Sequence, residues 1–568
     1  MLTHISIKNF KRFENVEFEL GKSVVLIGPN NCGKSTALQA LALWDIGLRQ
    51  WLAKPKRAKK APDKRPGVTI NRNDLISIPT PSTKLLWRDL QTHKGQMIEG
   101  KQQTQNIRID IIVDGESDGE TWSRGLEFDY ANPESLYCRP LRLSEDKKPK
   151  RMIIPDTAMD VHVAYLPPMS GLAAIEPKWE PGRISVLLGE GQTAQVLRNL
   201  CYYICHEHPE NWNELKESIK RLFGIELLEP RYIEARGEIT MAYKEHSITL
   251  DLANSGRGAQ QTLLLLAHLY ANPNTVLLLD EPDAHLEILR QRQTYQLITE
   301  VAERAGSQII AASHSEVVLN EAAGRDIVIA FVGSPHRIDD RGSQLLKSLR
   351  EIGFDQYYMA EQAGWVLYLE GSTDLEILRS FARILDHEAA ELLERPFVYY
   401  VYNQPIKAEK HFYGLSEAKQ DLVGIAIYDR LDKEPQQHER LKQLIWRKYE
   451  LENYLCSEDV LLDYAKGQND FWQQSRVYAM RDSIKKVSDS FQTIKNQDPW
   501  SGDTKASDFL QPLFAEYFKK LGLSNQMQKT NYHILASFVE ANMIDPDVKE
   551  KLDTIVEVAK AAKPSAED

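Results

Sequence analysis

Short apolar runs alternate with longer amphipathic stretches along most of this chain. The runs cover residues 23–27, 275–280, 307–313, 365–369, 396–403 and 422–428. Most of them are followed at once by a glycine, an acidic residue or a histidine. Strands of a parallel sheet that helices cover on both faces have this composition. The pattern therefore predicts an α/β fold.

The amphipathic stretches divide the chain into regions. Residues 185–225 read as two helices, and we expect a small helical lobe over about 170–235. No heptad repeat is sustained long enough to indicate a long coiled coil. We expect a first domain over residues 1–335, a connector over 336–364, a second α/β domain over 365–465 and a helical region over 466–568.

Length and charge narrow the possible functions. A chain of 568 residues is too long for one hydrophobic core. Its formal net charge of -11 argues against a protein that coats nucleic acid in bulk, although a local basic patch can still bind phosphates. Residues 54–65 form such a basic segment, and their composition fits a solvated loop or a phosphate-contacting loop.

Several features favour a cytoplasmic protein without a membrane anchor. The first residues lack the apolar core of a signal peptide, and no stretch approaches the roughly 18 apolar residues of a membrane span. The five cysteines are scattered and odd in number, which favours a reducing compartment. Cys201 and Cys205 lie in an amphipathic stretch, where core packing explains them better than a metal site does.

A glycine-rich loop follows the first apolar run. Its sequence, GPNNCGKS, matches G-x-x-x-x-G-K-[ST] and stands between a strand and a helix, as a phosphate-binding loop must. Lys34 should reach the β- and γ-phosphates of ATP, and Ser35 should hold Mg²⁺. The residues expected to bind nucleotide here are Gly28, Pro29, Asn30, Asn31, Cys32, Gly33, Lys34, Ser35 and Thr36.

The other half of an ATPase site lies far downstream. One apolar run ends in Asp280 and Glu281, and the next is followed by His314. We expect Asp280 to bind Mg²⁺ through water and Glu281 to act as the general base for the attacking water. His314 is placed to contact the γ-phosphate.

The order of these motifs resembles that of ABC-type ATPases of the SMC/RecF branch. Between the two half-sites the sequence NSGRGAQ opens an apolar helix and stands where that family has its signature turn. The resemblance covers roughly residues 1–335. It implies that Ser255 and Gly256 contact the ATP that is bound to a second copy of the chain. It therefore implies a homodimer or a higher homo-oligomer.

Acidic residues follow two of the later apolar runs. Glu370 and Asp374 come after one run, and Asp429 and Asp432 come after another. Ligands of open parallel sheets bind at the edge where such strands end. Carboxylates that meet there repel one another unless a cation binds, and oxygen ligands suit Mg²⁺ or Mn²⁺. The alternative for Asp374 is a helix cap.

This second region resembles a TOPRIM domain. The segment EGSTD matches the E-G-x-x-D motif, whereas DRLD departs from D-x-D and leaves Asp429, Asp432 and Glu434 as possible ligands. An ABC-type head followed by a TOPRIM domain resembles the OLD (overcoming lysogenization defect) family. That resemblance implies a further metal ligand at Glu452, in the segment ENY, and a catalytic lysine, for which Lys529 is preferred over Lys505.

The OLD resemblance implies a metal-dependent nuclease regulated by ATP, acting in bacterial defence against phage, in some cases with a partner protein. The expected catalytic residues are Glu281, His314, Glu370 and Lys529. DNA is the favoured substrate. The alternatives are an RNA-cleaving enzyme and an ATPase platform whose TOPRIM-like domain binds without cutting, which the irregular DRLD segment motivates.

Overall fold

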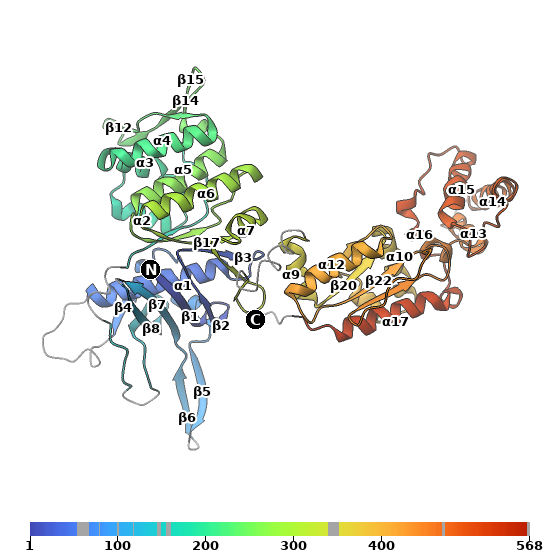
Figure 1. Cartoon of the computed structure of the whole chain (residues 1–568), viewed down its shortest axis with the longest axis horizontal. Coiled ribbons are helices and arrows are strands. Elements are labelled where there is room, and N and C mark those ends of the chain that lie inside the picture. Colours follow the sequence, from blue (N-terminus) through green and yellow to red (C-terminus); the bar gives the residue numbers. More distant parts are fainter. Residues whose placement is uncertain are drawn as a thin grey trace. The chain divides into compact units, whose positions relative to one another are not determined.

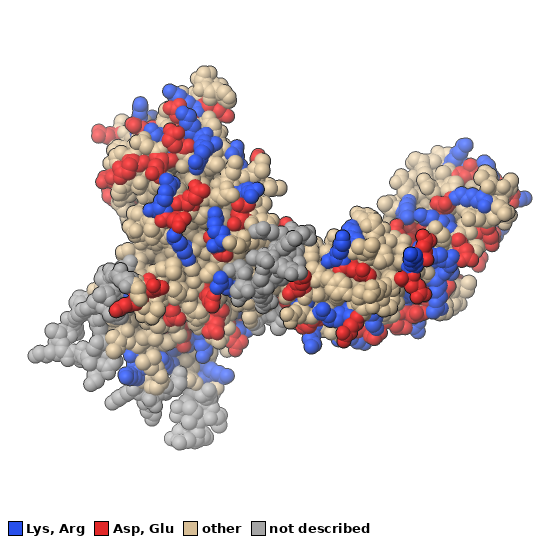
Figure 2. Space-filling view, in the orientation of Figure 1, with Lys and Arg blue, Asp and Glu red and all other residues tan. Residues whose placement is uncertain are grey.

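The chain folds into two compact units, residues 1–350 and 351–567 (Figure 1). Each unit has its own hydrophobic core. Acidic and basic side chains are interspersed over the visible face of each unit (Figure 2). The basic segment of residues 54–65 lies outside the described residues. This computed structural model describes residues 1–53, 67–78, 80–98, 101–117, 119–144, 149–154, 161–338, 352–467 and 472–564.

A six-stranded sheet forms the centre of the first unit. Its strand order is β10-β16-β17-β3-β18-β19, and neighbours are parallel except β18 and β19. Three of the predicted apolar runs form β3, β16 and β17, whose side chains are buried almost throughout. The strands are β3 (Ser23–Ile27), β10 (Val163–Leu166), β16 (Val276–Asp280), β17 (Gln308–Ser313), β18 (Ile327–Ala330) and β19 (His336–Arg337).

A second, antiparallel sheet covers one side of the long helix α1 (Lys34–Ala53). Its strand order is β2-β1-β7-β8-β9-β4. Side chains of α1 share one core with both sheets, so the helix that follows the glycine loop is fixed from two sides. The strands are β1 (Leu2–Phe10), β2 (Phe13–Glu19), β4 (Val68–Asn71), β7 (Ile109–Ser117), β8 (Glu120–Asn132) and β9 (Ser135–Pro140), and a separate hairpin joins β5 (His93–Ile98) to β6 (Lys101–Asn106).

The helical lobe differs in detail from the prediction of two helices over residues 185–225. Helix α2 (Pro181–Gly189) ends early, and Pro209 starts a new helix directly after α3. The buried Cys201 packs in α3. The lobe and its neighbours contain α3 (Leu197–Glu207), α4 (Pro209–Phe223), β11 (Glu226–Leu227), β12 (Arg231–Ile233), β13 (Glu238–Thr240), β14 (Ala242–Glu245), β15 (Ile248–Asp251), α5 (Arg257–Ala271), α6 (Ile288–Arg304) and α7 (Glu316–Ala322).

The second unit is built on a four-stranded parallel sheet of order β21-β20-β22-β23. Strand β20 lies next to β22, so the residues that follow these two strands meet at one edge. Part of the expected connector forms helix α9, which contacts β20 and α12. The elements are α9 (Phe354–Ala363), β20 (Trp365–Leu369), α10 (Ser372–Ile384), α11 (Ala389–Leu392), β21 (Val398–Tyr400), α12 (Pro405–Ala418), β22 (Val423–Tyr428) and β23 (Leu441–Ile445).

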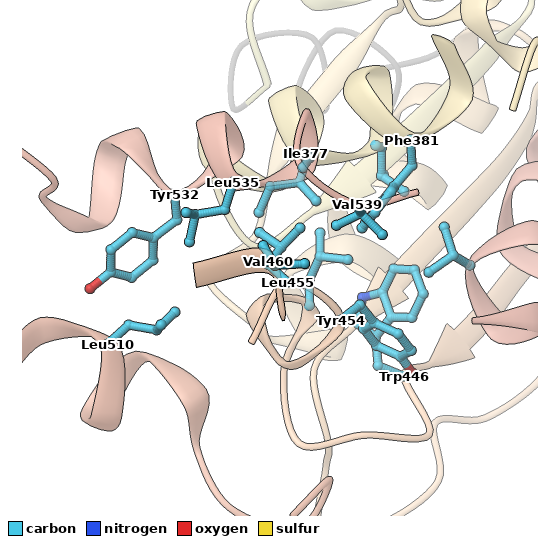
Figure 3. Packing of buried hydrophobic residues seen from close by; sticks show 14 of the residues in the cluster. Ile377, Phe381, Trp446, Tyr454, Leu455, Val460, Leu510, Tyr532, Leu535 and Val539 are labelled. Atoms are coloured by element: carbon cyan, nitrogen blue, oxygen red, sulfur yellow. The ribbon is translucent and has the colours of Figure 1, made fainter. Parts of the chain in front are cut away.

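The C-terminal helices complete the core of this second sheet. Ile377 and Phe381 of α10 pack against Leu535 and Val539 from the end of the chain (Figure 3). Residues on both sides of position 466 thus belong to one hydrophobic cluster. The helices are α13 (Glu458–Lys466), α14 (Gln473–Lys495), α15 (Ala506–Lys520), α16 (His533–Ala536) and α17 (Pro546–Ala561).

Candidate functional site

The glycine loop connects β3 to α1 in a conformation that requires its glycines. Gly28 and Gly33 have φ angles of +156° and +108°. A Cβ atom at Gly28 would lie 2.9 Å from the carbonyl oxygen of Phe331, which is closer than real contacts allow. The loop therefore turns its backbone in a way that bulkier residues cannot follow.

Lys34 and the loop border a cavity of about 560 Å³. Lys34 is buried, and its Nζ donates to the carbonyl oxygens of Gly28 (2.7 Å) and Pro29 (2.6 Å). The cavity is lined by Arg12, Asn30, Asn31, Cys32, Gly33, Lys34, Ser35, Thr36 and Glu281. The loop residues and Glu281, which are distant in sequence, therefore face one space of a size suited to a nucleotide's phosphates.

The start of α1 and the end of β16 bring the expected Mg²⁺ ligands together. Ser35 Oγ donates to Asp280 Oδ1 at 2.9 Å, and the hydroxyl of Tyr165, on β10, donates to Asp280 Oδ2 at 3.1 Å. Burial raises the pKa of Asp280, whereas these two hydrogen bonds oppose the rise. Sequence reasoning missed Tyr165. Its signal was a hydroxyl near the end of a short apolar run.

Glu281 and His314 also lie next to each other. Glu281 has a left-handed φ of +49°, and its N–H donates to the carbonyl oxygen of Ala312 at 2.9 Å. This turn directs the residue away from the strand and toward the cavity. His314 Nδ1 lies 3.9 Å from Glu281 Oε1. The pair is partly exposed, as groups that meet a ligand must be.

The signature-like turn stands apart from this cavity within one chain. Ser255 Oγ donates to the carbonyl oxygen of Leu252 at 2.7 Å, and Gly256 precedes the first turn of α5. A Cβ atom at Gly256 would meet open space. Among the described residues, those that line the nucleotide cavity include neither Ser255 nor Gly256.

Four carboxyl groups converge at the edge of the second sheet. Glu370 follows β20, and its N–H donates to Asp374 Oδ2 at 3.0 Å. Asp429 follows β22, and Asp429 Oδ1 accepts from the N–H of Leu451 at 3.2 Å. That contact places the short 3₁₀ helix Leu451–Tyr454, which carries the buried Glu452, beside the strand ends. We call Glu370, Asp374, Asp429 and Glu452 the carboxylate cluster.

The electrostatics of the carboxylate cluster reflect this crowding. Burial, together with the neighbouring charges of Glu452 and Glu370, raises the pKa of Asp374 to about 7. Burial and the charges of nearby acids raise the pKa of Glu452 to about 7 as well. The pKa of Asp429 rises far above its usual range because the group is buried and shares a hydrogen bond with the Glu370 carboxyl. Protons or a cation must therefore balance the cluster.

Lys529 is the lysine next to the cluster. Its Nζ lies 3.7 Å from Glu452 Oε1. Partial burial opposes its charge, but Glu452 and three further acids outweigh this effect and raise its pKa. Lys505 instead lies 3.8 Å from Glu450, a buried residue that accepts the N–H of Ser507 at the start of α15.

Asp432 and Glu434, which the sequence left open as ligands, are both exposed. The carboxylate groups that shift the pKa values of the cluster do not include theirs. Within the described residues, no three His, Cys, Asp or Glu side chains stand in a ready-made metal-binding arrangement. The oxygen donors of the cluster fit Mg²⁺ or Mn²⁺ by their chemistry.

Two family models match parts of the first unit. Residues 1–46 match "AAA ATPase domain", and residues 208–320 match "AAA domain, putative AbiEii toxin, Type IV TA system". The two matches include the glycine loop and the Asp280–Glu281 strand end. The chain therefore carries an ATPase domain of the AAA/ABC type, for which ATP is the expected nucleotide.

The solved structures similar to the chain include SMC head domains. That from Thermotoga maritima is 15% identical, with a TM-score of 0.31, and the match covers 59% of this chain and 98% of that chain. An Smc head domain with an extended coiled coil from Pyrococcus furiosus, bound to the C-terminal domain of ScpA, is 15% identical, with a TM-score of 0.31 and coverages of 62% and 99%. Because these TM-scores are low, the assignment of an ATPase domain rests on the family models alone.

None of the curated proteins compared with this chain matches it. Within the described residues, every helix is too short or too polar to cross a membrane.

Proposed function

We propose that this chain is an ATP-regulated, metal-dependent nuclease of the OLD type. The observation that carries the proposal is the convergence of Glu370, Asp374, Asp429 and Glu452 at one edge of a parallel sheet. Such crowding of buried acids is unfavourable by itself and is resolved by a divalent cation. The first unit supplies the ATPase, and the second unit supplies the centre that cuts a nucleic-acid backbone.

In the ATPase, each role is assigned to a group that borders the cavity. Lys34 would bind the β- and γ-phosphates, and Ser35 with Asp280 would hold Mg²⁺. Glu281 aligns the attacking water as its general base, and His314 contacts the γ-phosphate. The left-handed turn at Glu281 supports its role because the turn directs the residue toward the cavity.

The ATPase needs a second copy of the chain to complete its site. Ser255 and Gly256 stand at the start of α5, outside the cavity lined by their own chain's glycine loop. A helix N-terminus favours anions. We assign Ser255 and Gly256 to the ATP of a partner protomer, which makes a homodimer the smallest active assembly.

In the nuclease centre, a divalent cation when bound would activate water and stabilise the leaving oxygen of the phosphodiester. Glu370, Asp374, Asp429 and Glu452 would hold it. Lys529 places a positive charge beside Glu452, where it can contact an oxygen of the substrate phosphate. Asp432 lies outside this centre. The role in cytoplasmic defence against phage, with or without a partner protein, rests on the sequence resemblance.

The test is plasmid cleavage by the full-length chain with Mn²⁺ or Mg²⁺, with and without ATP. We expect Glu370→Ala to reduce cleavage by at least about 100-fold, because removal of a group that binds the catalytic metal removes much of the rate enhancement. ATP hydrolysis should stay within about twofold of wild type, since Glu370 lies in the other unit.

Asp432→Ala is the matched comparison, because it removes an exposed acid from the segment that carries Asp429 after β22, but outside the cluster. It should leave cleavage unchanged. A loss equal to that of Glu370→Ala would restore Asp432 as a ligand. DNA that stays intact with the wild-type protein, under every combination of metal and nucleotide, would remove the DNA-cutting proposal and direct the same assay to RNA.

A second candidate is an ATPase platform whose second unit binds nucleic acid or a partner without cutting. The exposed position of Asp432 and the lack of a ready-made three-ligand arrangement among the described residues favour it. The two candidates differ in phage-protection assays in cells. Protection that survives Glu370→Ala would favour the platform, and protection lost together with cleavage would favour the nuclease.

A further inference from the structure

An unusual turn follows β21 beside the carboxylate cluster. Tyr402 and Asn403 have φ angles of +52° and +57°. Asparagine tolerates this left-handed region, but tyrosine rarely adopts it, and such strain persists only where the surroundings enforce it. The turn leaves Tyr402 68% exposed, although an aromatic ring gains most when it is buried.

Specific contacts hold this turn in place. The N–H of Tyr402 donates to the backbone oxygen of Glu370 at 3.2 Å. Lys407, in the first turn of α12, donates from Nζ to the carbonyl oxygen of Tyr400 at 3.1 Å. The same ammonium lies 4.5 Å from the centre of the Tyr402 ring and 5.4 Å from that of Tyr399. The ring is therefore oriented by a cation while most of its surface stays accessible.

The position of this ring relates it to the cluster. Strand β21 is the neighbour of β20, so Tyr402 follows one strand where Glu370 follows the next. A backbone hydrogen bond joins the two residues directly. A nucleic-acid strand that places a phosphate at the cluster would have a neighbouring nucleotide within reach of Tyr402.

We propose that Tyr402 is a stacking platform for an unpaired base of the strand that enters the carboxylate cluster, with Lys407 as the adjacent phosphate contact. This inference rests on the proposed nuclease function and adds that the strand is single-stranded or locally unpaired. A base offers its flat face to a side chain only when it leaves the duplex stack, and aromatic stacking accepts any base.

The test uses fluorescence anisotropy of a labelled oligo-dT with the full-length Glu370→Ala protein and Mg²⁺, so that binding is measured without cleavage. In that background, Tyr402→Ala should weaken binding by about 5- to 150-fold, the range that stacking of one base supplies. Tyr402→Phe and Tyr402→Trp should bind within about twofold of the parent, because they keep the ring.

Two further variants exclude simpler explanations. Ile406→Ala removes an apolar side chain that is 67% exposed on the following helix turn, and it should leave binding unchanged. Tyr402→Gly relieves the backbone strain while removing the ring, so it should unfold no earlier than the parent and still bind weakly. An oligonucleotide of abasic sites should bind the parent and Tyr402→Ala equally, since it has no base to stack.

The outcomes separate the two levels of the proposal. If wild type cuts DNA but Tyr402→Ala binds oligo-dT as the parent does, the stacking platform is wrong and the nuclease stands. If Ile406→Ala weakens binding as much as Tyr402→Ala does, the contact is a general apolar one and the platform is again overturned. If wild type neither cuts nor binds nucleic acid, the nuclease fails and takes the platform with it.

Discussion

At the scale of single residues, the structure adds Tyr165 to the ATPase residues that were expected from the sequence. Its hydroxyl holds one oxygen of Asp280 while Ser35 holds the other. A carboxylate fixed from both sides meets a metal ion in one orientation, and loss of such a supporting hydrogen bond weakens metal binding or activity by roughly 10- to 100-fold. With the metal-binding role proposed for Asp280, we infer that Tyr165 is a positioning residue.

We expect Tyr165→Phe to raise the Mg²⁺ concentration that half-saturates ATP hydrolysis by at least about tenfold, with a smaller effect on the rate at saturating Mg²⁺. The measurement is steady-state ATPase activity across a Mg²⁺ titration.

Tyr295→Phe is the control for Tyr165→Phe. Tyr295 is also buried, and its hydroxyl donates to Asp326 at 2.8 Å, in the same unit but outside the cavity. Both variants should lose on the order of 1 kcal/mol of stability. Only Tyr165→Phe should shift the Mg²⁺ dependence, and equal shifts in both would reduce Tyr165 to a structural role.

Some functional residues could be predicted from the sequence and others could not. Lys34 and Ser35 follow from a motif of fixed spacing, and Asp280 follows from the acidic end of a separate apolar run. In the structure Ser35 Oγ lies 2.9 Å from Asp280 Oδ1. Tyr165 and Tyr402 belong to no motif, because their positions depend on which strands become neighbours. Asp432 looked equivalent to Asp429 in sequence, but the chain turns after β22 and leaves it exposed.

At the scale of elements, the carboxylate cluster exists because strand ends, a helix start and a 3₁₀ helix meet. The apolar runs predicted β20, β21 and β22, and the acids after β20 and β22 predicted the edge where they meet. Strand β23 was not predicted, since its sequence, LKQLI, mixes polar and apolar residues at a partly exposed position. Glu452 was expected only from a resemblance, and the contact of Leu451 with Asp429 supplies its physical reason.

The raised pKa values in this cluster predict how stability depends on pH. Asp374 and Glu452 bind protons more tightly in the folded chain, with pKa values of about 7, than in the unfolded chain. Their stabilising contribution is complete below about pH 4 and is lost as pH rises toward and through 7. When a chelator keeps divalent cations away, we expect the Tm of the second unit to fall by several degrees between pH 5 and pH 8.

A divalent cation competes with these protons, so Mn²⁺ should raise this Tm more at pH 8 than at pH 5. Calorimetry of the full-length chain measures both effects. The double variant Asp374→Asn, Glu452→Gln should flatten the pH dependence, whereas Asp432→Asn should not. A wild-type Tm that is the same at both pH values, with and without Mn²⁺, would contradict raised pKa values in the carboxylate cluster.

At the scale of the whole molecule, the separation of Ser255 from the glycine loop predicts activity shared between chains. Lys34→Ala should lose ATP binding, and Ser255→Arg should place a bulky cation where a partner's nucleotide must approach. Each variant alone should be inactive. Mixed in equal amounts, they should recover up to about a quarter of wild-type ATPase activity, because half of the dimers then contain one intact site of two.

The measurement is ATP hydrolysis by the mixture against each variant alone. A Lys34→Ala, Ser255→Arg double variant mixed with the Lys34→Ala chain is the control and should stay inactive, since no pairing of these chains contains an intact site. Activity of Ser255→Arg alone at the wild-type level would show that the site is complete within one chain.

The shared core of the second unit limits how this protein can be rearranged. Leu535 of α16 and Val539, which follows that helix, belong to the same hydrophobic cluster as Ile377 and Phe381. A truncation near residue 466 would strip these side chains from the sheet and remove Lys529 with them. In evolution and in engineering, the carboxylate centre should consequently be transplanted only as a cassette that runs from α9 to the end of α17.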